Sequence, residues 1–549
     1  MPTINISLKD LNNLVGKKIS EKDLPDLLAY AKAELSGIEG DDVSVQFNDT
    51  NLPYLWCVEG LAILFKGVLG KEKGIPDIKI EKGDYKIIAD RSVRSVRPFI
   101  SAFVAKGGKI DEFFLKQVIQ LQEKFCENFG RRREKVAIGV YPSRKISFPV
   151  YYKAVPPKSV RFVPLEFTKE MTLAEILEEH PKGKEFAWIL ENTKKYPLLS
   201  DSNKEILSFP PIINSHTMGK LDLEDNELFF EATGTDAEGV NLAANIFAHV
   251  LSMRGFSIHS VKISYVGKNV ITPDICVEKH KLDTDKVSSL LGIELKDSEI
   301  KKLLEMARFN FKSGNVEIPC FRNDIMHSVD VIEDIGIMYG FGNVEPLPLT
   351  AYTIGGTFDL QKKVDKLRDI AVGLEYQEIL SPILTSREVL VERMNLKRAL
   401  DLVEIDNPMS AGFSVLRSWL LPGLMDVLMH NKHVDFPQKI FEQGLVSVRR
   451  NDTITDEERI AGISSHVGVS FTKARQAVDA ILKACDVVAV YQDMEHSSFI
   501  SGRVAQVVIN DKPVGFVGEI HPAVLTSWGL DMPAAGFELN LSELFKIIK

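Results

Sequence analysis

Four acidic residues are spaced along one short stretch so that together they could bind a metal ion. Asp330, Glu333 and Asp334 stand at positions i, i+3 and i+4, so a helix would place them on one face. Asp324 lies six residues upstream of Asp330 and could reach the same point from the preceding loop. Clustered carboxylates repel each other unless a cation neutralises them, and oxygen ligands without cysteine or paired histidine favour Mg²⁺ over zinc. The stretch therefore predicts a magnesium site.

A more ordinary interpretation of the same stretch is the acidic first turn of a helix. Ser328 is then the N-cap, and the acids interact favourably with the positive end of the helix dipole. Val329, Ile332 and Ile335 form the apolar stripe that would pack such a helix on a core. Both interpretations require a helix that begins near residue 328, and the spacing alone leaves both open.

Residues 270–346 form the compact unit that must position the acids. Apolar residues recur at helical spacing between 287 and 291 and between 300 and 307, with Asp297 as the expected N-cap of the second helix. Alternating residues on either side of Ser313-Gly314-Asn315 predict a hairpin. Two helices, a hairpin and a third helix resemble a winged-helix module. Since the module has no evident basic recognition helix, we expect it to serve as a scaffold and subunit contact.

Two regions precede this unit. Residues 1–85 are expected to mix short strands and helices in an N-terminal α+β domain, with a Lys- and Gly-rich boundary at Gly70 to Asp84. Residues 86–268 are expected to form a second α+β domain. The expected elements are helices over 23–35, 59–69, 115–125 and 239–253 and strands over 136–140 and 227–233.

Residues 350–549 are expected to form helices packed on an antiparallel sheet. Two alternating apolar runs flank Asn510 and Asp511, a pattern typical of a hairpin with a two-residue turn. At 549 residues the chain is too long for a single core, and its length favours about three to four domains. The predicted fold class is therefore α+β and multidomain.

Composition excludes several classes of protein. The net charge of −9 argues against a general nucleic-acid binder, so contact with RNA would need local patches or a more basic partner. Arg131-Arg132-Arg133 is the clearest such patch, and its alternative is a solvated helix C-terminus. The sequence has no run of 18 apolar residues, so we expect no membrane span. Five cysteines without a CxxC pair argue against disulfides or a zinc ribbon and favour a reducing cytoplasm.

Several blocks elsewhere in the chain resemble one known family. They are Asn48 to Pro53 followed by Leu55 to Ala62, Gly130 to Arg133 with Val136 to Tyr141, Phe209 to Ser215 with Thr233-Gly234-Thr235, and Asp324 to Asp334. The blocks resemble, in order and over the whole chain, the β subunit of phenylalanyl-tRNA synthetase of the archaeal and eukaryotic type. The resemblance implies that residues 86–268 are an editing domain. It also implies a Mg²⁺ ion, shared with the α subunit, at Asp324, Asp330, Glu333 and Asp334.

The editing domain of the family hydrolyses tyrosine that has been attached to tRNA(Phe) by mistake. The residues that match its editing pattern are Leu207, Asn214, Ser215, Glu231 and Thr233. The resemblance implies that Glu231 binds the tyrosine hydroxyl and that Ser215 and Thr233 orient water or substrate. Taken singly, Ser215 and Thr233 are also ordinary loop and strand residues, and Leu207 is also an ordinary core residue.

Residues 350–549 resemble a class II synthetase domain that lacks its catalytic motifs. In-line attack on ATP spreads negative charge over phosphate oxygens, which active sites of this class stabilise with arginines. The stretch that matches the first arginine motif, Lys439 to Gly444, has Phe441 in that place, and Gly536 to Leu541 near the C-terminus contains no arginine. There is also no Walker or Rossmann glycine motif. We therefore expect this domain to be silent in aminoacylation.

The resemblance implies an (αβ)2 heterotetramer in which the α subunit binds ATP and phenylalanine. This chain would act as scaffold, contact tRNA(Phe) and clear mischarged tyrosine in the cytoplasm. The alternative is a non-catalytic paralogue of a synthetase that binds RNA or protein. Such a paralogue would have no reason to keep both the editing residues and the acidic cluster.

Overall fold

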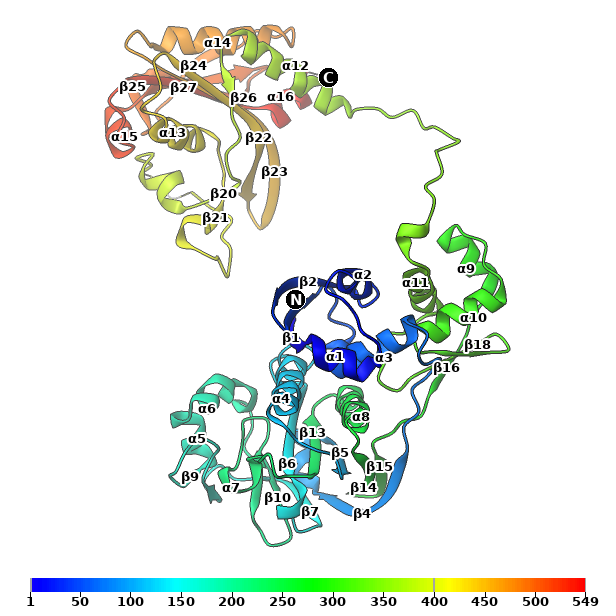
Figure 1. Ribbon diagram of the computed structural model, residues 1–549. Helices are drawn as coiled ribbons and strands as arrows, with labels where there is room; N and C mark the ends of the chain where they lie inside the picture. The colour runs from blue at the N-terminus through cyan, green and yellow to red at the C-terminus, as the bar shows by residue number, and fades with distance from the viewer. Residues whose placement is uncertain (1, 398–399, 549) are drawn as a thin grey trace. The chain divides into compact units, whose positions relative to one another are not determined.

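The computed structural model describes residues 2–397 and 400–548. These residues form two compact units, Met1–Pro348 and Leu349–Lys549, each with its own sheets and cores (Figure 1). The predicted α+β, multidomain class is confirmed. None of the helices in the described ranges combines the length and hydropathy that a bilayer span requires.

The N-terminal part of the first unit is a small α+β domain. Its three-stranded antiparallel sheet has the order β1-β3-β2 and carries three helices. The elements are β1 (Thr3–Ser7), α1 (Leu8–Val15), α2 (Leu24–Ala29), β2 (Ala33–Glu39), β3 (Asp42–Phe47) and α3 (Val58–Val68). The helix expected over residues 23–35 is wrong beyond Ala29. The chain reverses at Lys32, which has a φ of 52°, and β2 then pairs with β3. Pairing within the sheet therefore overrides the helical spacing.

A ten-stranded mixed sheet follows, in the order β12-β11-β10-β7-β4-β14-β5-β13-β6, with β15 paired to β14. Its first strand, β4, begins at Ile80, ahead of the expected boundary at residue 85. The strands are β4 (Ile80–Ala89), β5 (Phe99–Lys106), β6 (Val136–Pro142), β7 (Val150–Val155), β10 (Tyr196–Ser200), β11 (Ile206–Phe209), β12 (Ile213–Asn214), β13 (Glu227–Gly234), β14 (Ser257–Tyr265) and β15 (Lys268–Thr272).

Two helices, α4 (Glu112–Glu127) and α8 (Ala237–Met253), cover the face of this sheet that meets the N-terminal domain (Figure 1). An insert between β7 and β10 has a separate apolar core. The insert contains β8 (Arg161–Phe162), β9 (Met171–Thr172), α5 (Leu173–Glu179), α6 (Pro181–Phe186) and the 3-10 helix η4 (Ala187–Leu190).

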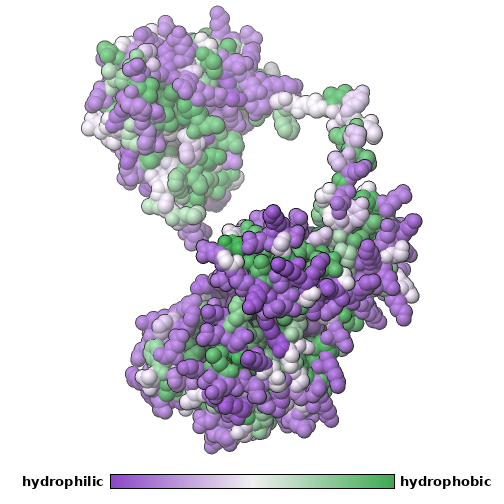
Figure 2. All heavy atoms as spheres, in the orientation of Figure 1, coloured by the Kyte–Doolittle hydropathy of each residue, from purple (hydrophilic) through white to green (hydrophobic). Residues whose placement is uncertain are grey.

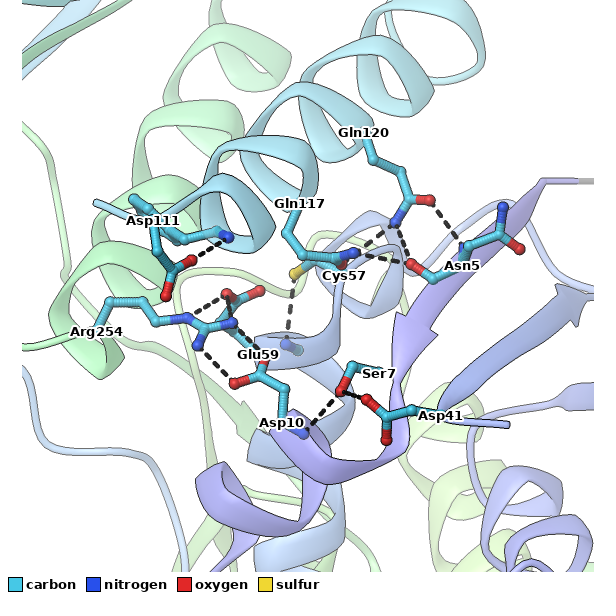
Figure 3. A network of polar contacts seen from close by, with 12 residues as sticks. Asn5, Ser7, Asp10, Asp41, Cys57, Glu59, Asp111, Gln117, Gln120 and Arg254 are labelled. Atoms are coloured by element: carbon cyan, nitrogen blue, oxygen red, sulfur yellow. Dashed lines mark hydrogen bonds and ion pairs between the residues drawn. The ribbon is translucent and has the colours of Figure 1, made fainter. Parts of the chain in front are cut away.

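A polar network joins the N-terminal domain to the large sheet domain (Figure 3). Arg254, at the end of α8, donates to both oxygens of Asp10 at 2.8 and 2.6 Å and to Glu59 at 2.6 Å. Glu59 is fully buried, and Arg254 is the cation that pairs with it. Gln117 of α4 also donates to the Asn5 carbonyl at 2.8 Å. The two domains therefore share polar contacts as well as a core.

The last part of the first unit is the expected winged-helix-like module. Its strands form a small antiparallel sheet in the order β16-β18-β17. The elements are β16 (Glu278–Lys281), α9 (Thr284–Leu291), α10 (Asp297–Met306), β17 (Asn310–Lys312), β18 (Asn315–Ile318) and α11 (Ser328–Tyr339). The last two helices begin at Asp297 and Ser328, the residues that were expected to cap them, so the N-caps lie one residue earlier, at Lys296 and His327.

The second unit is a seven-stranded sheet with an apolar core on each face. The sheet has the order β19-β22-β23-β27-β26-β25-β24. The expected hairpin joins β25 to β26 through Asn510 and Asp511, whose φ angles of 50° and 61° suit a tight hairpin turn. The strands are β19 (Gln377–Glu378), β22 (Gln438–Arg450), β23 (Thr453–Ser465), β24 (Val490–Asp493), β25 (Phe499–Ile509), β26 (Lys512–Ile520) and β27 (Ala534–Asn540). The helices are α12 (Asp359–Gly373), α13 (Leu421–His430), α14 (Phe471–Lys483), α15 (Pro522–Ser527) and α16 (Leu541–Ile547).

Candidate active site

A cavity of about 170 Å³ opens between the large sheet and its insert. Asn214, Glu231 and Thr233, three of the five residues matched to an editing pattern, line it together. They come from β12 and from alternate positions of β13, whose side chains share one face. The other lining residues include Cys126, Arg133, Lys182, Ser208, Pro210 and Pro211.

Glu231 is the chemically distinctive residue of the cavity. Its side chain is 3% exposed, and Oε1 accepts a hydrogen bond of 2.9 Å from the Tyr141 hydroxyl. Oε2 is buried and has no hydrogen-bond partner among the described residues. Burial raises the pKa of Glu231 to about 7, although the bond from Tyr141 and the charge of Arg97 both act to lower it. A buried acceptor without a partner is costly, and such a cost suggests that the oxygen pairs with a ligand.

Sheet register creates the space around this carboxylate. Glu231 of β13 stands opposite Gly139 of β6, and Tyr141 is on the same face two residues along. A Cβ added at Gly139 would lie 2.2 Å from the Tyr141 hydroxyl and 2.5 Å from Glu231 Oε1. Only glycine therefore lets the Tyr141 hydroxyl reach the carboxylate. Burial and the neighbouring Glu231 raise the pKa of Tyr141, so its hydroxyl remains a donor.

Thr233 is held by a buried arginine. Arg97 is 1% exposed and donates to Thr233 Oγ1 at 3.2 Å and to the Thr233 carbonyl at 2.7 Å. The same guanidinium donates to the carbonyls of Arg133 and Glu134 at 3.1 and 2.9 Å. Arg97 therefore fixes the end of β13 against the turn that follows α4. The Thr233 hydroxyl proton remains available for a hydrogen bond to another group.

Arg133 supports the cavity wall. Its Nη1 donates to the carbonyls of Pro211 and Ile212 at 3.2 and 2.9 Å. Its guanidinium lies over the Phe186 ring, 4.2 Å from the centroid, which ties the wall to the insert. Arg133, one of the three arginines of the basic patch, therefore makes contacts that support the fold.

The remaining two matched residues do not line the cavity. Leu207 is fully buried in the core beneath the sheet. Ser215 is also fully buried and is the N-cap of a short helix, where its Oγ accepts from the Met218 amide at 3.2 Å. The Ser215 amide donates to the Leu207 carbonyl at 2.9 Å. This pair therefore lies next to the cavity wall and shapes it through the backbone.

Two of the four acids in the expected metal site surround an arginine. Arg322 donates to both oxygens of Asp324 at 2.6 Å and to Asp334 at 2.7 Å. Arg322 is almost fully buried, and Asp334 is 7% exposed. Burial raises the pKa of Asp334 despite this pairing. The guanidinium therefore supplies the positive charge that the sequence spacing assigned to a metal ion.

The other two acids face different partners. Asp330 accepts from the amides of Met326 and His327 at 2.8 and 2.7 Å, as the acid of a helix N-terminus. Glu333 is exposed and pairs with Lys32 of the N-terminal domain at 2.9 Å. Within residues 2–397 and 400–548, no three His, Cys, Asp or Glu side chains are arranged around one ion. The four carboxylates do not by themselves form the coordination shell of Mg²⁺.

In the second unit, the stretches that match the two arginine motifs place phenylalanines in the core. Phe441 and Phe537 are 0% and 1% exposed and belong to the core on one face. Two arginines that contact this sheet pair with carboxylates of its strands. They are Arg417, which pairs with Glu442 at 2.5 Å, and Arg459, which pairs with Glu538 at 2.9 Å and with Glu457 at 2.7 Å.

Sequence reasoning missed two residues that matter in the cavity, Tyr141 and Arg97. Tyr141 directly follows the strand expected over residues 136–140 and belongs to β6, and its alternation with Gly139 places both on one face. Only the pairing of β6 with β13 brings them to Glu231, and that register is not visible in either strand alone. Arg97 reaches Thr233 over 136 residues of sequence.

Known protein families match the second half of the chain. A model described as the phenylalanyl tRNA synthetase beta chain CLM domain matches residues 345–541. A second, described as the tRNA synthetase B5 domain, matches residues 280–341, which include the acidic segment.

Relatives that align with the whole chain also cover the residues that line the cavity. The chain is 39% identical over 570 residues to the phenylalanine–tRNA ligase beta subunit of Thermococcus kodakarensis, covering 99% of both chains. It is 39% identical over 558 residues to that of Pyrococcus abyssi, covering 100% of both. A crystal structure of an N-terminal fragment of the phenylalanyl-tRNA synthetase beta subunit from Pyrococcus horikoshii superposes with a TM-score of 0.60 at 40% identity. It covers 62% of this chain and 100% of the fragment. The chain belongs to the family of phenylalanine–tRNA ligase β subunits.

Proposed function

We propose that this chain supports the attachment of phenylalanine to tRNA(Phe) and itself hydrolyses tyrosine that has been attached by mistake. The observation that carries the hydrolytic part is the unpartnered Oε2 of Glu231 in a cavity that Asn214 and Thr233 also line. The first part follows from membership of the family, since the relatives are named as phenylalanine–tRNA ligase β subunits.

The selection of tyrosine follows from the state of Glu231. Tyr141 holds one carboxylate oxygen, and a substrate tyrosine hydroxyl would donate to the other. Phenylalanine would leave that oxygen buried and unpaired. A lost hydrogen bond to a charged group costs about 1.5–3 kcal/mol, or roughly ten- to a hundredfold in rate. Sites that hydrogen-bond a substrate hydroxyl reject the analogue without it for this reason.

Hydrolysis of the ester also needs a positioned water and donors for the developing oxyanion. Asn214 Oδ1 lies 3.3 Å from the Tyr141 hydroxyl, which leaves its Nδ2 as a donor at the cavity. The Thr233 hydroxyl, oriented by Arg97, is the second polar group of the cavity assigned to water or substrate. We assign Leu207 and Ser215 to shaping the wall through the backbone contact that joins them.

Aminoacylation is proposed to take place on a partner α subunit in an (αβ)2 heterotetramer, where ATP and phenylalanine bind. The buried Phe441 and Phe537 support a silent synthetase-like sheet in this chain. Large apolar side chains between residues 347 and 358 and at 409 are almost fully exposed. In Figure 2, some green spheres appear among the paler ones along the segment that joins the two units. Exposed apolar groups of this size are typical of a protein interface.

A Mg²⁺ ion at Asp324, Asp330, Glu333 and Asp334 would need oxygen ligands from the α subunit, because Arg322 and the backbone already engage three of these carboxylates. Glu333 is the most exposed of the four and would be the first to turn toward a partner. We place the complex in the cytoplasm, where the five free cysteines would stay reduced.

The proposal is tested with the purified complex of this chain and its α subunit. The complex should release tyrosine from tyrosyl-tRNA(Phe) well above the uncatalysed rate, and the α subunit alone should not. Release by neither preparation would favour a non-catalytic, RNA- or protein-binding role for this chain.

A further inference from the structure

A second, basic groove lies next to the insert. It has a volume of about 640 Å³, and its walls are the 3-10 helix η2 (Arg91–Ser95) and residues 192–195. Four of the nine lining residues are cations: Arg91, Arg94, Lys194 and Lys195. None of the described lining residues is acidic, in a chain whose net charge is −9. The remaining polar residues are serine, threonine and asparagine, which also donate to phosphate oxygens.

One continuous segment connects this groove to the cavity of Glu231. Lys182 lines the cavity, and Asn192 to Lys195 line the groove. Trp188 lies between them in η4 and is 41% exposed. The guanidinium of Arg132 stands over its ring, 5.9 Å from the centroid. An exposed tryptophan backed by arginine is the kind of surface on which a nucleobase stacks.

The opposite wall is tied to the cavity by Arg97. This residue lies two positions after the end of η2, and its buried side chain donates to the carbonyls of Arg133 and Glu134 and to Thr233. The hydrogen bonds of Arg97 therefore join the groove wall to the cavity.

The Arg131-Arg132-Arg133 turn is held in an unfavourable conformation. All three residues have left-handed φ angles, of 48°, 52° and 70°. Left-handed φ angles strain residues other than glycine, and strain of this kind concentrates at functional sites. The turn sends Arg133 to the cavity wall and Arg132 to Trp188. The strained turn therefore contacts both the cavity wall and Trp188.

We propose that the groove and Trp188 hold the single-stranded 3′ end of the aminoacylated RNA while its ester occupies the cavity. Arg91, Arg94, Lys194 and Lys195 bind backbone phosphates, and Trp188 stacks against a base. This inference rests on the proposed hydrolytic function, because it assigns the route by which that substrate reaches Glu231.

The test uses the complete complex with three variants of this chain. Lys194→Glu/Lys195→Glu reverses the groove charge, and Trp188→Ala removes the stacking surface. Lys17→Glu/Lys18→Glu is the matched control, because it changes two adjacent exposed lysines in the N-terminal domain. Each protein is given tyrosyl-tRNA(Phe) and the tyrosine ester of adenosine, which has no phosphate and no neighbouring base.

Both groove variants should raise KM for tyrosyl-tRNA hydrolysis and leave the adenosine ester rate unchanged. Stacking on one base is worth about 5- to 150-fold, which sets the expected rise for Trp188→Ala. The lysine variant should also lower the salt dependence of log KM by about 1.4, since each phosphate contact to a single strand contributes about 0.7. An unchanged KM in both groove variants would overturn the proposal while leaving the hydrolytic cavity intact.

A crosslinking measurement keeps the groove testable if hydrolysis itself fails. A tRNA(Phe) with a photoreactive base near its 3′ end is irradiated with the complex, and the attached peptide is identified. Attachment to residues 188–195 that is lost in Trp188→Ala supports the groove even when neither ester is hydrolysed. Attachment elsewhere, with no change in the variants, refutes it.

Discussion

Replacing Glu231 by glutamine should remove a pH dependence from the stability of the first unit. The folded protein keeps the Glu231 proton up to about pH 7, whereas the unfolded chain releases it near the ordinary value of 4.5. Between these values the folded state binds more protons, so the free energy of unfolding falls as pH rises. A pKa of about 7 against 4.5 corresponds to about 3 kcal/mol in total, of which roughly 2.5 kcal/mol falls between pH 5 and pH 8.

The assay is urea unfolding of residues 1–348 at pH 5 and pH 8, for the parent and for Glu231→Gln. A matched control is Glu227→Gln, at the half-exposed start of the same strand, where the carboxylate pairs with Lys106 at 3.3 Å. The parent should lose roughly 2.5 kcal/mol more than Glu231→Gln over this pH range, and Glu227→Gln should follow the parent. Parallel losses in the parent and Glu231→Gln would show that Glu231 is not held as a buried acid.

Three further outcomes are expected. Tyr141→Phe leaves both Glu231 oxygens unpartnered. In the same unfolding assay it should destabilise the first unit by about 1.5–3 kcal/mol at pH 8 and by much less at pH 5. An equal loss of stability at both pH values would contradict the hydrogen bond. Arg322→Met removes the cation that pairs with the buried Asp334, so it should lower the free energy of unfolding by about 3–5 kcal/mol in that assay. A near-neutral effect would mean that the pair is not buried. The purified chain without its partner should show only background pyrophosphate exchange with phenylalanine and ATP, because Phe441 stands where an arginine would bind phosphate; robust exchange would refute the silent domain.

Local patterns predicted much of the fold. The hairpin around Asn510 and Asp511 and the strand expected over residues 227–233 depend on neighbours in sequence, and both are confirmed. The helix expected over residues 23–35 is wrong after Ala29, because pairing of β2 with β3 decides that stretch. Tertiary context overrides helical spacing in such short segments.

In the candidate sites, too, local spacing predicted the helix but not the contacts made by residues distant in sequence. The i, i+3, i+4 spacing of Asp330, Glu333 and Asp334 on a helix agrees with α11. The cations that neutralise two of them, Lys32 and Arg322, could not be assigned from that spacing, because one belongs to another domain and the other to a loop. The resemblance pointed to three residues that line the cavity, Asn214, Glu231 and Thr233. The contacts that give them chemical character depend on sheet register and on burial.

The central claim is that the free oxygen of Glu231 selects a substrate hydroxyl, and a cycle of two enzymes and two substrates tests it most directly. The intact complex, with Glu231 or with Glu231→Ala, is given tyrosyl-tRNA(Phe) and phenylalanyl-tRNA(Phe), and the four deacylation rates are measured as kcat/KM. The substitution should slow tyrosine release by roughly ten- to a hundredfold, equal to a coupling of about 1.5–3 kcal/mol, and leave phenylalanine release nearly unchanged. Equal effects on both substrates, or no effect on either, would contradict the claim.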